Sequence, residues 1–216
     1  MAEKFHTELK AVKKDTVAMA LLGRSMLRDA VDALIRQDKE LAASVVAKKE
    51  QIHDMEVKLE EHCYQLIALN QPMAKDMRVI ACTLKMITAS MRIGRYGKVI
   101  ANIVKDISDK PHISHMMSIP HMGELVIDMI DDAIKAYDTE SIGLIADFSA
   151  RDDTIDALRH SIFRAGITHM MEDPKTITRC THYIMVARYL ERCAAHACKI
   201  AENVHYMNTG ERIEIH

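Results

Sequence analysis

Two aspartates four residues apart are the side chains in this sequence best placed for metal chemistry. Asp152 and Asp156 fall on one face of a helix, because side chains at i and i+4 are neighbours there. The next helix runs back past a turn at Glu172–Pro174, and positions equidistant from that turn lie at one height. Glu191 is then level with both aspartates. Three carboxylates at one height predict a site for a hard divalent cation or an iron ion.

The alternative for these carboxylates is a solvated acidic surface. Neighbouring arginines would neutralise it, and these are Arg151, Arg159 and Arg192.

The first half of the chain carries different residues at the matching positions. Lys49 and His53 take the places of the aspartates, and Met91 and Arg95 lie opposite them on the following helix. The lysine and the arginine would repel a dication. In the second half, Ala195 stands where a fourth carboxylate would complete the site. We therefore expect weak mononuclear metal binding or none, and only in the second half.

A ferritin-like di-iron metalloenzyme is an alternative of a different class. Such sites need two Glu-x-x-His motifs and two further glutamates that point into one four-helix core. Glu50–His53 and Glu202–His205 both have this spacing, but they occupy non-equivalent places in the two halves. Oxygen consumption in the presence of ferrous iron would distinguish this alternative.

Helices must position all of these residues. The apolar period over 41–66 alternates steps of four and three, which is typical of a bundle seam. Its positions are Leu41, Val45, Lys48, Ile52, Met55, Leu59, His62 and Leu66. No comparable stretch alternates with a period of two, and only 7 Gly and 4 Pro are present to form turns. The sequence therefore predicts an all-α protein.

Breaks in the helical pattern divide the chain into about six helices. The clear breaks are Asn70–Pro72, Pro111–Pro120 and Glu172–Pro174, and softer ones fall near Asp38 and Thr139–Glu140. Helices this long with short connections form antiparallel bundles.

The two halves of the chain repeat one another. A shift of 103 pairs Met26 with Met129 and Ile52 with Ile155, and a shift of 100 pairs Arg92 with Arg192. We therefore predict two tandem, pseudo-symmetric three-helix bundles. The first spans residues 1–109, a linker spans 110–121, and the second bundle spans 122–216.

Charge and motifs exclude several function classes. The net charge is −2, so we expect no nucleic-acid partner. No Gly-rich phosphate loop and no nucleophile on a strained turn is visible, which predicts a protein without enzymatic activity. The N-terminus lacks an apolar signal region and no stretch is long and apolar enough to span a bilayer. These features predict a cytoplasmic protein, peripheral to the membrane at most.

Ordered motifs across the chain resemble the PhoU family of phosphate-signalling regulators. Asn70–Arg78 resembles the hairpin and third-helix start of that family, and Arg92–Gly94 with Ile100–Ile103 resembles its helix-three signature. Ala187–Arg192, followed by His196 and Lys199–Glu202, resembles the second copy more closely. The resemblance covers nearly the whole chain.

The resemblance implies an all-α cytoplasmic protein, often dimeric, that negatively regulates phosphate uptake. Its expected partners are a second copy of the chain, the ATP-binding subunit of the phosphate ABC transporter, and a sensor histidine kinase. Many members also carry metal at paired acidic motifs. This chain departs from that pattern at Met91, Arg95 and Ala195, so a multinuclear cluster is not expected.

Overall fold

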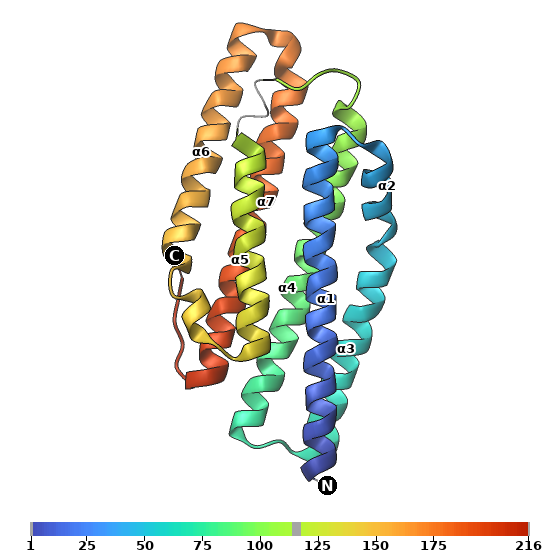
Figure 1. Cartoon of the computed structure of the whole chain (residues 1–216), viewed down its shortest axis with the longest axis vertical. Helices are drawn as coiled ribbons and strands as arrows, with labels where there is room; N and C mark the ends of the chain where they lie inside the picture. The colour runs from blue at the N-terminus through green and yellow to red at the C-terminus, as the bar shows by residue number, and fades with distance from the viewer. Residues whose placement is uncertain (1, 114–117, 216) are drawn as a thin grey trace.

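The computed structural model describes residues 2–113 and 118–215, and these ranges consist of helices and connecting turns. The helices are α1 (Ala2–Arg36), α2 (Lys39–Ala47), α3 (Lys49–Asn70), α4 (Ala74–Ile107), α5 (Ile119–Thr139), the 3-10 helix η2 (Ile142–Ile145), α6 (Phe148–Glu172), the 3-10 helix η3 (Pro174–Thr176) and α7 (Ile177–Thr209). Figure 1 shows α1 to α4 as one bundle and α5 to α7 as a second bundle beside it. With α2 and α3 taken as one helix, the predicted pair of three-helix bundles is confirmed. Within the described ranges we find no helix with the length and apolarity of a bilayer-spanning segment.

The helices end where the sequence predicts breaks. Asp38 caps α2, since its Oδ1 accepts hydrogen bonds from the backbone N–H groups of Glu40 and Leu41 at 3.0 and 2.9 Å. Gln71 ends α3 in the left-handed conformation at φ 47°, and Glu140 ends α5 at φ 56°. These local signals set the lengths of the helices that carry the candidate sites.

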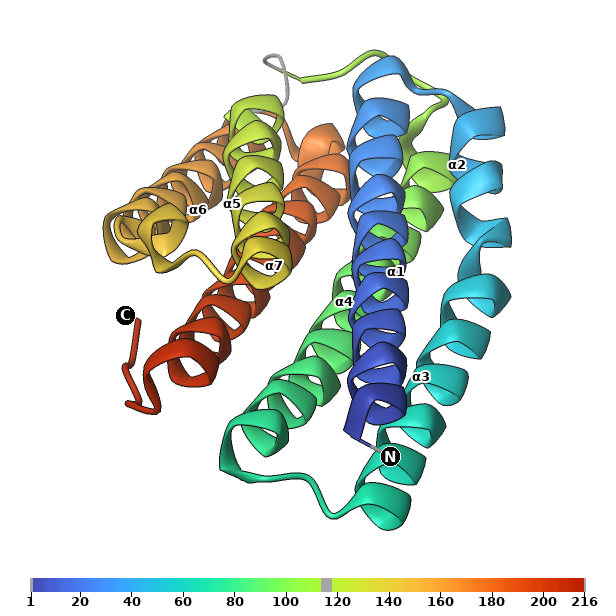
Figure 2. The ribbon, with the colours of Figure 1, turned by 60° about the horizontal axis from the view of Figure 1, so that its bottom comes forward.

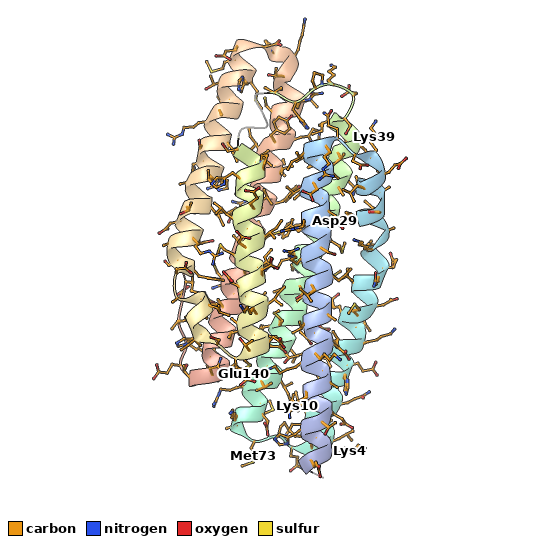
Figure 3. All side chains as sticks on the ribbon, in the orientation of Figure 1. Lys4, Lys10, Asp29, Lys39, Met73 and Glu140 are labelled. Carbon is orange, nitrogen blue, oxygen red and sulfur yellow. The ribbon has the colours of Figure 1, made fainter. Side chains whose placement is uncertain are left out.

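The helix expected to run without interruption over 41–66 is instead broken at Lys48. Its backbone N–H bonds to the Val45 carbonyl at 3.2 Å, a tighter turn than the α-helical bond. Its Nζ donates to Asp29 Oδ2 on α1 at 2.7 Å; Asp29 is labelled in Figure 3. A contact with a distant helix therefore accompanies the break.

The two bundles share one apolar core. Both views place α1 and α4 beside α5 and α7 (Figure 1 and Figure 2), and α1 packs on α5 as α4 packs on α7. Thr83 on α4 and Tyr137 on α5 are both buried, and their hydroxyls hydrogen-bond across the interface at 2.7 Å. Nearby, Arg24 Nε donates to Asp131 Oδ1 at 2.7 Å. Equivalent helices thus meet each other, as a pseudo-twofold relation requires.

The connection between the bundles is held by a histidine. His112 Nε2 donates to the Leu34 carbonyl at 3.0 Å, and its Nδ1 accepts from the Tyr183 hydroxyl at 2.7 Å. Leu34 belongs to α1 and Tyr183 to α7, so this side chain bridges both bundles. α5 begins at Ile119, inside the predicted linker 110–121, because a proline is tolerated in the first turn of a helix.

Candidate functional site

The acidic candidate site lies between α6 and α7 of the second bundle. Asp152 on α6 and the thiol of Cys198 on α7 lie close enough for each to shift the pKa of the other. Burial and the neighbouring charge of Asp156 raise the pKa of the Asp152 carboxyl. Burial, followed by the charge of Asp152, raises the pKa of Cys198 to about 12, so the thiol keeps its proton. The two helices therefore bring this end of the predicted site together.

Arginines lie against the other two predicted ligands. Asp156 Oδ1 lies 3.7 Å from Arg159 Nε, and Glu191 Oε2 lies 3.3 Å from Arg188 Nη1. Glu191 Oε2 and Arg159 Nε are both buried, and neither has a hydrogen-bond partner among the residues that the structure describes. Both carboxylates therefore already have a counter-charge nearby.

These carboxylates do not form a preassembled metal centre. In the part of the chain that the structure describes, no three His, Cys, Asp or Glu side chains are grouped so as to hold a metal ion. Ala195 supplies no ligand, and a cation would have to displace the two arginines. Metal binding at Asp152, Asp156 and Glu191 stays a prediction, and it is a prediction of weak binding.

The equivalent place in the first bundle is a basic pocket of about 280 Å³ between α3 and α4. Its lining residues are Met26, Lys49, Ile52, His53, Met91, Arg95 and Lys98. The structure thus brings together all four residues that the repeat places opposite the acidic site. It adds Lys98, which the sequence analysis did not single out. The repeat pairs Lys98 with Cys198, and the nearness of Cys198 to Asp152 is seen only in the structure, so the sequence carried no signal for Lys98.

The di-iron alternative is not supported. The glutamate of Glu50–His53 is exposed on α3 and lies 3.0 Å from Lys49 Nζ. The glutamate of Glu202–His205, on α7 of the other bundle, accepts a hydrogen bond from Lys199 Nζ at 2.8 Å. Both motifs are engaged in local ion pairs on separate bundles and do not face one four-helix core.

Comparison with known proteins matches both halves of the chain. The model of the PhoU domain family matches residues 16–104 and 119–204. A phosphate-specific transport system accessory protein PhoU homolog from Caulobacter vibrioides is 35% identical over 207 residues, which are 95% of this chain and 90% of that protein. A protein of the same name from Clostridium acetobutylicum is 29% identical and covers 98% of this chain and 97% of its own length.

Solved structures agree with this result. The crystal structure of PhoU from Pseudomonas aeruginosa matches with a TM-score of 0.92 at 32% identity, and covers 96% of this chain and 100% of that chain. The phosphate transport system regulatory protein PhoU from Streptococcus pneumoniae matches with a TM-score of 0.89 over 97% of this chain and 99% of its own. At 24% identity the second match shows the fold alone. The tandem bundles, the two domain matches and these relatives show that the chain belongs to the PhoU family.

Proposed function

We propose that this protein is a cytoplasmic negative regulator of phosphate uptake that acts by protein–protein contact and performs no catalysis. The observation that carries the proposal is the match to both copies of the PhoU domain, together with relatives named as accessory proteins of phosphate-specific transport. An accessory protein of a transporter needs a contact with it. The proposed contact is the ATP-binding subunit on the cytoplasmic side.

Two further partners belong to the proposal. A second copy of the chain forms a homodimer, and a sensor histidine kinase receives the signal from the transporter. Light scattering on the purified chain tests the first partner, with an expected mass of twice 24.5 kDa. Pull-down of the kinase with and without the transporter subunit tests the second.

Uptake of labelled phosphate by a strain that lacks the gene tests the regulatory role. We expect uptake to remain high in phosphate-rich medium, and the intact gene to restore repression. In parallel, the tagged protein should retain the purified ATP-binding subunit on a column. Normal repression in the deletion strain would contradict the proposal.

A further inference from the structure

The basic pocket of the first bundle has the geometry of an oxyanion site. Two helices supply cationic donors from opposite sides: Lys49 and His53 come from α3, and Arg95 and Lys98 from α4. The floor is apolar and includes Ile52, which is 1% exposed. Cationic donors from two helices that line one pocket attract an anion together, and hydrogen bonds from charged donors to an oxyanion are stronger than neutral ones.

The charges of this pocket are balanced by carboxylates only in part. None of its seven lining residues is acidic. Lys49 lies 3.0 Å from Glu50, and His53 Nδ1 lies 3.3 Å from a glutamate one turn along α3. Arg95 and Lys98 have no ion pair within the described ranges. Two of the four cationic side chains therefore line the pocket outside any ion pair.

The positive charges of the pocket also act on a neighbouring carboxyl. Glu50 is exposed, and its pKa is lowered by Lys49 first, with further contributions from His53 and Lys98. The lysines of both helices and the histidine thus act on one point at the pocket rim. A negatively charged group placed there is favoured for the same reason.

The second bundle has the same apolar floor and different charged residues around it. Its equivalent residues are Met129, Asp152, Ile155, Asp156, Glu191, Ala195 and Cys198. The methionine and isoleucine of the floor recur in both bundles and are buried in both. The surrounding residues are acidic in one bundle and basic in the other, so the two places favour ligands of opposite charge.

We propose that the pocket of Lys49, His53, Arg95 and Lys98 binds a phosphate-class oxyanion, either inorganic phosphate or the phosphate group of a small monoester. A phosphate group carries roughly −1.5 to −2 charges at pH 7 and offers three or more acceptor oxygens. Arg95 provides a planar fork for two of these oxygens, and the two lysines provide point charges. The inference goes beyond the proposed regulatory role and stands on the pocket alone.

Calorimetric titration of the full chain tests the proposal. Inorganic phosphate, glycerol 3-phosphate and sulfate are added separately at constant ionic strength. We expect saturable binding of phosphate or of the monoester, and the arm that binds more tightly identifies the source of the group. The double variant Arg95→Met with Lys98→Met should lose at least tenfold in affinity. Helix content and melting temperature confirm that the variant is folded.

A matched control removes the same charges elsewhere on α4. Arg92 and Lys105 are exposed on that helix, and Arg92→Met with Lys105→Met should leave the affinity within twofold of the parent. If both double variants weakened anion binding equally, the net charge of the protein and not the pocket would explain the binding, and the proposal would be overturned. Absence of binding to all three anions would also overturn it. The uptake assay on the deletion strain is independent, so the regulatory role and this site can fail separately.

Discussion

The two bundles carry residues of opposite charge around the same apolar floor. Ile52 and Ile155 are 1% and 0% exposed, and the methionines Met26 and Met129 lie buried beside them. Above this floor, Lys49 and His53 of the first bundle correspond to two aspartates of the second, Met91 corresponds to a glutamate, and Arg95 to an alanine. Core positions are constrained by close packing, whereas a rim in contact with water accepts either charge at small cost. Divergence of function within a repeat is therefore expected at the rim.

The bundles also differ in how closely their first and last helices approach. A Cβ atom on Gly97 would lie 2.7 Å from the backbone carbon and oxygen of Met26, so α1 and α4 meet backbone to backbone. The equivalent position on α7 is Ala197, which is fully buried. Close packing of α1 on α4 in the first bundle therefore requires a glycine at position 97. The equivalent position of the second bundle accommodates a methyl group.

The largest expected effect tests this difference in packing. Gly97→Ala should lower the free energy of unfolding by about 2 kcal/mol or more, because the new methyl group meets rigid backbone. For a chain of this length the melting temperature should fall by roughly 4 to 8 °C. The control is Gly143→Ala, where the nearest atom would be 4.0 Å away. An unchanged melting temperature for Gly97→Ala would show that the helices can separate freely.

The second prediction concerns the acidic candidate site of the second bundle. Ala195→Asp should tighten Mn²⁺ binding at least tenfold, about 1.4 kcal/mol, because it supplies the missing carboxylate. Ala195→Asn serves as the uncharged control, and Asp156→Ala should abolish the weak binding of the parent. Metal analysis with calorimetry measures all three. Several tightly held ions per chain, unaffected by Asp156→Ala, would refute the predicted asymmetry between the bundles.

The third prediction compares the two buried tyrosines that link the bundles. Tyr137→Phe should cost about 1 kcal/mol in stability, since it removes the buried hydrogen bond to the Thr83 hydroxyl. Tyr183→Phe should cost less, because its partner His112 is only half-buried and water can replace the hydroxyl. Denaturant unfolding measures both variants. The reverse order would mean that the connection, and not the helix interface, holds the bundles together.

The smallest expected effect is the dependence of stability on pH. Burial lowers the pKa of His112, and burial with Arg192 and Arg92 lowers that of His196. As the pH falls, both histidines therefore bind protons in the unfolded chain before they do so in the folded chain. Their contribution to the free energy of unfolding is complete above the unfolded pKa of about 6.5. It is lost as the pH falls toward the lower pKa values of the folded state.

His112→Gln should reduce this pH dependence without removing it, because His196 remains. Thermal unfolding from pH 7.5 to pH 5 measures the slope, and His121→Gln on the exposed surface of α5 is the control. An identical slope in His112→Gln and the parent would exclude His112 as a contributor.

Much of the fold could be read from local signals. The breaks at Asp38 and Glu140 were predicted from composition, and the structure places a capping side chain at the first and a left-handed residue at the second. Such signals act within a few residues of the chain. The break at Lys48 was missed, because the apolar period continues through it and its side chain is held by Asp29 on another helix.

The candidate sites were also predicted only in part. The repeat and the hairpin geometry placed Lys49, His53 and Arg95 opposite the acidic positions, and the structure joins them in one pocket. Arg159, which engages Asp156, was among the arginines expected to neutralise the acidic site. Arg188 was not singled out, although it also lies three residues from its carboxylate, Glu191, on the same helix.

The sequence alone determined the helical class, the tandem repeat and the opposite charges of the two equivalent sites, because period, proline positions and residue type are local properties. Tertiary structure alone decided the shared core of the two bundles, the contact of Asp152 with Cys198, and the inclusion of Lys98 in the basic pocket. The shared core joins helices that are distant along the chain, and the other two contacts join successive helices, α6 with α7 and α3 with α4. Their meeting depends on how whole helices pack, and a local pattern does not encode that packing.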